Sequence, residues 1–235
     1  MNNLAIIPAR GGSKRIPKKN IRNFLGKPII QYPIEVARNC GLFNEVIIST
    51  DDDDIISAAL SAGGKIPFRR SMKNSDDFAT LSDVLLEVIT KYVEKTFDFV
   101  CLILPTGVMV SSDLLIESYN LLQNNPVLSG IVPVAKFSHP IERAFAINEN
   151  KELKLLHPEN KNSRTQDLTP SFYDTGQFYW IKTKDFLLQK TLFMNSMGAF
   201  QISELQFQDI DTEDDWKMAE IKYSLHRTVN DEAKS

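Results

Sequence analysis

Short apolar runs separated by helical patterns constrain the fold of this chain more than any other sequence feature. The runs that we interpret as buried strands are Leu4–Ile7, Val46–Ser49, Phe99–Leu104 and Gly130–Val134. Between the second and third runs, apolar residues over Leu81–Tyr92 recur at i, i+3, i+4 and i+7, which predicts an amphipathic helix. Strands that alternate with helices indicate βαβ units, so we expect an α/β fold with a mostly parallel sheet.

Weaker patterns extend this order of elements. Further helices are expected over Ile30–Arg38, Asp54–Ala62 and Asp113–Leu122. Pro33 is tolerated in the first of these only within the first turn. Near the C-terminus we expect an aromatic strand over Gln177–Ile181, a last strand over Leu205–Ile210 and a helix from Thr212.

Length and composition fit one globular domain over residues 1–235, with 43% hydrophobic and 24% charged residues. The net charge of -3 argues against a nucleic-acid partner, because such proteins are usually basic. No apolar stretch approaches the roughly 18 residues of a membrane span, so we expect no membrane partner. Cys40 and Cys101 form no CxxC pair, which disfavours a zinc site or disulfide scaffold and makes a reducing, cytoplasmic location the simplest prediction.

Residues 135–176 differ from the rest of the chain. They are rich in polar residues, Asn and Pro, and they contain few long apolar runs. We interpret this stretch as an excursion from the sheet within the single domain, which would serve as a lid or a dimerisation arm.

A basic, glycine-containing loop follows the first expected strand, at the place where ligands bind in such sheets. Gly11 and Gly12 remove side-chain bulk, so backbone N–H groups can approach an anion, and Ser13 adds a hydroxyl donor. Clustered cations and free amides would suit a triphosphate. The cations of this loop, which has no acid, are Arg10, Lys14, Arg15, Lys18, Lys19 and Arg22.

The loop matches neither G-x-x-x-x-G-K-[ST] nor G-x-G-x-x-G, so it is neither a Walker A loop nor a dinucleotide fingerprint. The alternative to a phosphate site is a solvated loop whose lysines only aid solubility.

Two carboxylates near the C-terminus form a candidate magnesium site. Asp209 and Asp211 alternate at strand spacing and therefore point to one side of an extended segment. Paired carboxylates can ligate Mg²⁺, which prefers oxygen ligands and substrate phosphates. The residues alone favour a simpler role, because Thr212 and Asp215 have the spacing of a helix capping box. Both roles can hold at once.

Residues 7–20, which read IPARGGSKRIPKKN, resemble the opening signature of the acylneuraminate cytidylyltransferases, the CMP-sialic acid synthetases. The resemblance covers nearly the whole chain, from Ile7 to about Trp216, and it is densest at the two ends of that range. It implies a Rossmann-like, mostly parallel sheet of the nucleotide-diphospho-sugar transferase type with an inserted dimerisation or lid segment. It also implies that Asp211 and Asp209 bind the catalytic Mg²⁺, that Asn20 positions the nucleotide, and that the CTP phosphates are held by Arg10, Ser13, Lys14 and Lys19, of which Arg10 and Lys19 act in catalysis with Asp211.

Residues 68–80 resemble the family region that contacts cytosine and ribose, which reads R-P…D-x-A-S. The resemblance assigns Arg70, Ala79 and Thr80 to the nucleotide. Ser71 stands where proline is usual in the family. The alternative for Thr80 is that it only starts the following helix.

Residues 104–107, which read LPTG, resemble the family's Q-P-T-S-P segment and imply that Thr106 contacts the sugar. Leu104 replaces the common glutamine and cannot hydrogen-bond a sugar, which speaks against N-acetylneuraminic acid as the substrate.

The segment 173–180, YDTGQFYW, resembles the version found in pseudaminic acid cytidylyltransferases. Under this resemblance, Arg164 would pair with the keto-acid carboxylate, and Gln166 and Gln177 would contact hydroxyl or amide groups. The alternative for Phe178–Trp180 is an ordinary aromatic strand in the core.

The resemblance therefore implies transfer of CMP from CTP to the anomeric hydroxyl of an acidic keto-sugar, with release of pyrophosphate. Pseudaminic acid is the expected acceptor, and legionaminic, N-acetylneuraminic and KDO acids are the alternatives. From other classes, a non-catalytic nucleotide- or sugar-binding protein and a structural protein are the rivals. Family members are usually homodimers, so residues 135–176 would reach over the neighbour's active site.

Overall fold

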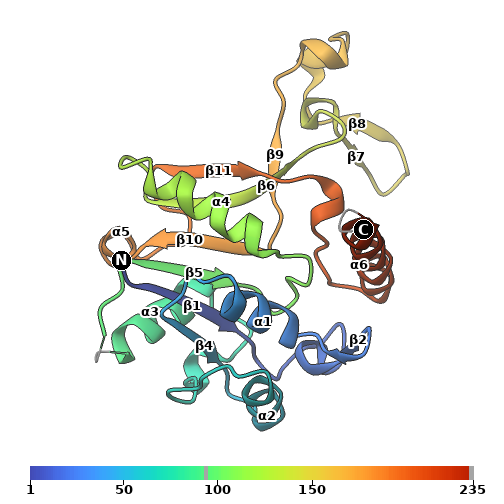
Figure 1. Cartoon of the computed structure of the whole chain (residues 1–235). Coiled ribbons are helices and arrows are strands. Elements are labelled where there is room, and N and C mark those ends of the chain that lie inside the picture. Colours follow the sequence, from blue (N-terminus) through green and yellow to red (C-terminus); the bar gives the residue numbers. More distant parts are fainter. Residues whose placement is uncertain (93–94, 233–235) are drawn as a thin grey trace.

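A seven-stranded sheet lies at the centre of the chain, in a computed structural model that describes residues 1–92 and 95–232 (Figure 1). The strands lie in the order β11 (Met197–Gln201), β6 (Gly130–Lys136), β10 (Phe178–Lys182), β5 (Phe99–Ile103), β1 (Asn3–Pro8) and β4 (Glu45–Ser49), and β9 (Phe172–Asp174) also pairs with β6. Only β9 and β10 run against the other strands of this sheet. The expected mostly parallel α/β sheet is confirmed.

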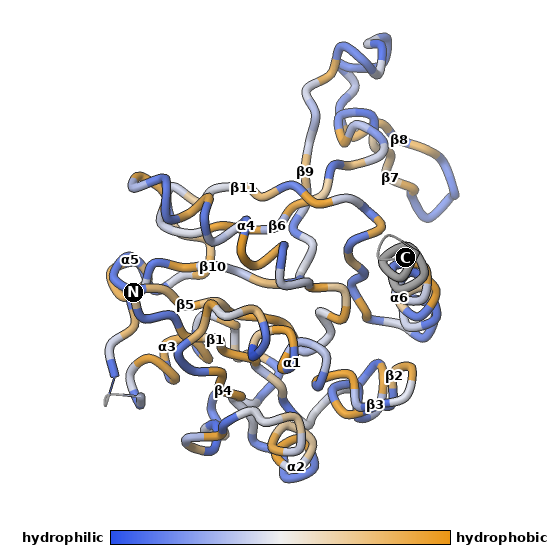
Figure 2. The backbone as a smooth tube through the Cα atoms, in the orientation of Figure 1, coloured by the Kyte–Doolittle hydropathy of each residue, from blue (hydrophilic) through white to orange (hydrophobic). Residues whose placement is uncertain are grey.

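Helices cover both faces of the sheet, as alternation along β1 requires. Ala5 and Ile7 face a core that includes residues of α1 (Gln31–Asn39), α2 (Asp53–Ser61) and α4 (Ser112–Gln123). Leu4 and Ile6 face a second core built with α3 (Leu81–Lys91) and α5 (Thr183–Gln189). Figure 2 shows hydrophobic positions along the central strands and mixed colours along the projecting segment.

Most of the expected elements are present, and two differences have physical reasons. The strand expected over Leu205–Ile210 is wrong: residues 204–206 form a 3₁₀ turn and 207–211 are extended without a strand partner. The edge position belongs instead to β11, which contains two exposed positions and a glycine and therefore lacks an apolar run. Pro33 lies in the first turn of α1, as expected.

A bulge separates β9 from β10 beside the carboxyl end of β5. Thr175 donates to Pro133 O through its N–H and its hydroxyl, at 3.2 and 2.9 Å. Gly176 has a φ of +62°, a conformation that favours glycine. Gln177 O accepts from Leu104 N at 2.9 Å. The bulge thus brings residues 175–177 to the edge of the sheet where β1 and β5 end.

The segment 137–171 projects away from the sheet between β6 and β9 (Figure 1). It contains a hairpin of β7 (Phe145–Ile147) and β8 (Leu153–Leu155) and the short 3₁₀ helices Ile141–Arg143, Pro158–Asn160 and Thr165–Asp167. Ala135 and Lys136 still belong to β6, so the projection begins two residues after the expected boundary.

A third core joins the C-terminal helix to the region after the basic loop. The ring of Phe24, in the small hairpin of β2 (Asn23–Phe24) and β3 (Lys27–Pro28), is fully buried. It meets Tyr32, Trp216 and Tyr223 edge-on, with centroids at 5.4, 5.5 and 5.7 Å. Trp216 and Tyr223 belong to α6 (Glu213–Glu232). Within the described residues, no helix combines the length and apolarity needed to cross a membrane.

Phe24→Ala should lower the free energy of unfolding by about 3–5 kcal/mol, because it leaves a cavity among three aromatic rings. Urea unfolding followed by tryptophan fluorescence measures this change. Phe78→Ala is the matched control, since Phe78 is 90% exposed and its loss should change stability by less than about 0.5 kcal/mol. Equal effects of the two substitutions would contradict the assignment of this core.

Candidate active site

A cavity of about 320 Å³ opens at the edge of the sheet where β1 and β5 end. Its walls come from the loop after β1, the start of α3, the loop after β5 and the segment before α6. The predicted site residues among its lining are Arg10, Lys19, Asn20, Arg70, Ala79, Thr80, Thr106, Asp209 and Asp211. A neighbouring cavity of about 310 Å³ shares Arg10, Lys19 and Asn20 and adds Ser13, Lys14 and Arg15. The structure therefore brings together every residue predicted for nucleotide or metal.

Lys19 connects the basic loop to the acidic segment. Its Nζ donates to Ile210 O at 2.6 Å and lies 3.5 Å from Asp211 Oδ1. Arg15 also donates to Asp211, at 2.7 Å. Segments about 190 residues apart in the chain thus form one charged surface.

The other cations of the loop contact the segment before α3. Arg10 donates to Asp76 O, and its second guanidinium nitrogen lies 3.1 Å from Asp77 Oδ1. Lys14 donates to the same carboxylate, and this hydrogen bond lowers the pKa of Asp77. Asp77 is thus an exposed counter-ion of Arg10 and Lys14, two residues that are predicted to bind phosphate. A more strongly charged anion could replace its carboxylate.

Gly11 differs from the prediction of a free backbone amide. The N–H of Gly11 donates to Asp51 Oδ1 at 3.3 Å, so this amide is already satisfied. A Cβ at Gly11 would lie 2.4 Å from Asp52 Oδ2, which shows that Gly11 permits close packing against the loop after β4. Asn20 is buried and donates to Arg10 O at 3.0 Å, so it supports the loop from inside.

The segment 209–215 contains the predicted capping box, and the metal-binding role of its two carboxylates stays a prediction. Asp209 and Asp211 line the cavity. Thr212 Oγ1 accepts from Asp215 N at 3.2 Å, and Asp215 accepts from Thr212 N at 2.8 Å, which forms the predicted capping box at the start of α6. The same Asp215 carboxylate accepts from Asp211 N at 3.1 Å, so the cap also fixes the backbone of Asp211.

These carboxylates fit a magnesium ion that is shared with a ligand. Asp209 is exposed by surface area, yet desolvation by the surrounding atoms, followed by repulsion from Asp211, raises its pKa. A cation between the two carboxylates would relieve that repulsion. Among the described residues, no group of three or more His, Cys, Asp or Glu side chains could hold a metal, so phosphate oxygens and water would have to complete the coordination.

The wall formed by α3 and the segment before it has the features of a base site. Arg70 is buried, donates from Nε to Ser49 Oγ at 2.9 Å, and has its pKa lowered to about 10 by burial. Thr80 lines the cavity and also caps α3, accepting from Asp83 N at 3.2 Å. The helix-start alternative for Thr80 is therefore confirmed without excluding contact with a ligand.

The predicted sugar contacts divide into two groups. Thr106 and Leu104 line the cavity. Gln177 reaches this edge, but it is only 1% exposed, and its Nε2 donates to Thr175 O at 3.1 Å and approaches Gln208 O at 3.5 Å. These contacts favour a supporting role beneath Asp209 over the direct sugar contact that the sequence predicts.

Arg164 and Gln166 do not line the cavity of their own chain. They belong to the projecting segment, where Arg164 forms a two-pronged ion pair with Asp167 at 2.7 and 3.1 Å. The predicted contact between Arg164 and a sugar carboxylate would thus need another chain or a movement of this segment.

Sequence reasoning missed several lining residues: Pro8, Asn74, Asp76, Leu81, Val84 and Pro105. Pro8 is the last residue of β1 and Pro105 lies two residues beyond β5. Their position at the strand ends points to the cavity, although neither was assigned a role. Asn74 ends the short 3₁₀ helix Met72–Asn74 and Asp76 lies in the loop after it, and no local sequence pattern points to either residue.

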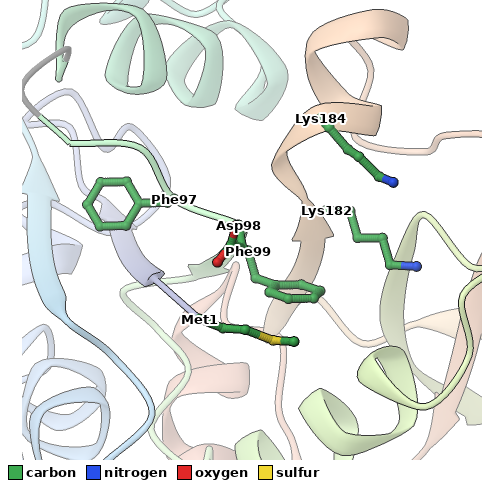
Figure 3. Close-up of a pocket in the computed structure, with 6 residues that line it drawn as sticks. All are labelled: Met1, Phe97, Asp98, Phe99, Lys182 and Lys184. Carbon is green, nitrogen blue, oxygen red and sulfur yellow. The ribbon is translucent and has the colours of Figure 1, made fainter.

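A third cavity, of about 380 Å³, lies at the opposite end of the strands, where β5 begins and β10 ends (Figure 3). Its lining residues are Met1, Phe97, Asp98, Phe99, Lys182 and Lys184. It contains no predicted site residue, and Lys182 already donates to Pro126 O at 2.9 Å. Asp98 is the one acid among the described residues of this lining, and its carboxylate accepts a hydrogen bond from Asn2 N at 2.9 Å.

Comparison with known proteins agrees with this geometry. The chain is 40% identical over 229 residues to the pseudaminic acid cytidylyltransferase of Campylobacter jejuni, covering 96% of this chain and 98% of that protein. It is 26% identical to a CMP-N,N'-diacetyllegionaminic acid synthase of Legionella pneumophila, over 97% of this chain and 98% of the relative.

A solved CMP:2-keto-3-deoxy-manno-octonic acid synthetase complexed with CTP shares the fold. The TM-score is 0.70 at 19% identity, with 96% of this chain and 100% of that chain covered. A family model described as cytidylyltransferase matches residues 4–218. The chain belongs to the cytidylyltransferase family.

Proposed function

We propose that this enzyme transfers CMP from CTP to the anomeric hydroxyl of pseudaminic acid and releases pyrophosphate. The observation that carries the proposal is the cavity at the carboxyl edge, which joins the basic loop, the carboxylates Asp209 and Asp211, and the loop of Thr106. The relative from Campylobacter jejuni, which is named for this acceptor and matches nearly the full length of the chain, supports the choice of sugar.

The charges of the cavity suit attack of a hydroxyl on the α-phosphorus. Arg10, Lys14 and Lys19 would bind the phosphates and stabilise the negative charge that develops on them. Asp209 and Asp211 would hold Mg²⁺, which when bound supplies further charge neutralisation at the phosphate. Lys19 contacts both segments, so it would hold the bound phosphates at a fixed position relative to the carboxylates. A reaction whose rate depends on orientation requires such a fixed arrangement.

The sugar would lie against the loop after β5. Leu104 gives this wall an apolar contact, and Thr106 supplies a hydroxyl. Legionaminic, N-acetylneuraminic and KDO acids are the alternatives, and the cytoplasmic location stays a prediction.

We also propose a homodimer that forms through the projecting segment, 137–171. Its apolar side chains have little to pack against in one chain: Phe145 is 53% exposed, Ile147 70%, Leu153 66% and Leu156 56%. A partner would cover them, and it would place Arg164 of one chain near the cavity of the other.

Pyrophosphate release with CTP and Mg²⁺ tests the proposed reaction. Turnover should occur with pseudaminic acid and exceed turnover with legionaminic, N-acetylneuraminic and KDO acids by at least about 100-fold in kcat/KM. A different preferred acid would overturn the choice of sugar, and CTP binding without pyrophosphate release would favour the non-catalytic alternative.

Asp211→Asn should lower kcat/KM by more than about 100-fold at saturating Mg²⁺, because even supporting residues of metal sites contribute 10- to 100-fold. EDTA should abolish the activity of the unsubstituted enzyme. Asp214→Asn is the matched control, since Asp214 is almost fully exposed and does not line the cavity. Full Mg²⁺-dependent turnover by the Asp211 variant would contradict the assignment.

Light scattering after size exclusion should give twice the chain mass, and the double substitution Ile147→Asp, Leu153→Asp should give the monomer. Charges at buried interface positions are strongly unfavourable, which is the reason for the expected loss. Val127→Asp, at an 81% exposed position outside the segment, should leave the dimer intact. A monomeric unsubstituted protein would refute the proposed assembly.

A further inference from the structure

Asn74 has an amide whose orientation is set by its neighbours. Its Nδ2 donates to Glu87 Oε2 at 2.6 Å and approaches Asp83 O at 3.4 Å. A carboxylate and a carbonyl only accept hydrogen bonds, so the nitrogen must be the atom that faces them. The oxygen of the amide is therefore the atom left for the other side.

That oxygen is available to a ligand. Asn74 lines the cavity at the carboxyl edge of the sheet. Among the described residues, none donates a hydrogen bond to Asn74 Oδ1, and it is not one of the buried side-chain atoms that lack a partner. An open acceptor thus belongs to the wall that Leu81 and Val84 make apolar.

Glu87 holds Asn74 in this position. It is 8% exposed on α3 and accepts from Ser71 N at 3.0 Å, from Ser71 Oγ at 3.1 Å, from Asn74 and from Lys91. Glu87 therefore accepts hydrogen bonds from both ends of the turn 71–74, from Ser71 and from Asn74.

The position of the cavity's charges indicates which part of a nucleotide meets Asn74. The phosphates belong at the basic loop, on the side of Ser13 and Lys14. The apolar wall with Arg70 and Asn74 is then left for the flat base. Cytosine carries an amino group, a donor, at C4, whereas uracil carries a carbonyl oxygen there, and an acceptor on the wall distinguishes the two.

We propose that Asn74 Oδ1 accepts a hydrogen bond from the 4-amino group of cytosine and that Glu87 is the positioning residue that fixes this amide, so that the pair selects CTP over UTP. The proposal rests on the proposed cytidylyl transfer. It adds a specificity residue and the buried carboxylate behind it.

Asn74→Ala tests the base contact. Its kcat/KM for CTP should fall roughly tenfold, the effect of one lost hydrogen bond, while the value for UTP changes little. The ratio of kcat/KM for CTP to that for UTP is the readout, because a merely structural defect would lower both values together. An unchanged ratio overturns the proposal.

Glu87→Gln tests the positioning role, since its amide can present either oxygen or nitrogen to Asn74. The ratio should fall in this variant, and Glu87→Gln should change it little further when Asn74 is already alanine. Glu45→Gln is the matched control: Glu45 is also buried and bound by two lysines, and it does not line the cavity. Independent, additive effects of the two substitutions on the ratio would overturn the link between Glu87 and Asn74.

Different results refute the proposed function and the proposed base contact. Absence of pyrophosphate release by the unsubstituted enzyme with every acid refutes the proposed function. In that case, thermal shifts with CTP and UTP still test the base contact in the same variants. Equal shifts for the two nucleotides in the unsubstituted protein overturn it.

Discussion

The hydrogen bond from Lys19 to Ile210 O, at 2.6 Å, joins the two ends of the chain at the site. The basic loop follows the first strand, and the acidic segment precedes the last helix. The core around Phe24 makes this contact possible, because it fixes α6 against the hairpin that follows the loop. Arg22 adds to it by donating to Glu213 at 2.6 Å while its guanidinium lies over the Trp216 ring. Opposite charges meet at the cavity because an apolar core beneath them holds both segments.

The charges at the cavity are balanced within the protein. Arg10 and Lys14 contact Asp77, and Arg15 and Lys19 contact Asp211. The side chains of Arg10, Lys14, Arg15 and Asp77 are at least 36% exposed, whereas Lys19 is 20% exposed. None of these pairs is fully buried, so their exchange for ligand contacts costs less than the breaking of a buried pair. Binding of a triphosphate with magnesium would replace both sets of ion pairs. The cations would then contact phosphate oxygens, and the carboxylates would contact the metal. The arrangement keeps the loops ordered between reactions.

The sequence predicted the framework of the site because strand ends and charge clusters are local features. Arg10, Lys19 and Thr106 stand directly after or close to apolar runs, and Asp209 and Asp211 show their spacing. Asn74 and Glu87 escaped because their meeting depends on how a turn packs on a helix face. Gln177 was assigned to the sugar from its motif; it is 1% exposed at the bulge and its Nε2 donates to Thr175 O, so the sugar contact stays a prediction. The edge strand β11 was missed because its sequence has no apolar run. It is a strand because it pairs with β6.

A crystal structure of the protein with CTP and Mn²⁺ tests the central claim, that one cavity at the carboxyl edge holds the phosphates, the metal and the base. The account predicts an anomalous manganese peak at the carboxylates of Asp209 and Asp211. It also predicts phosphates on Arg10 and Lys19 and the cytosine beside Asn74. Nucleotide density in the cavity where β5 begins, or manganese away from both carboxylates, would contradict the account.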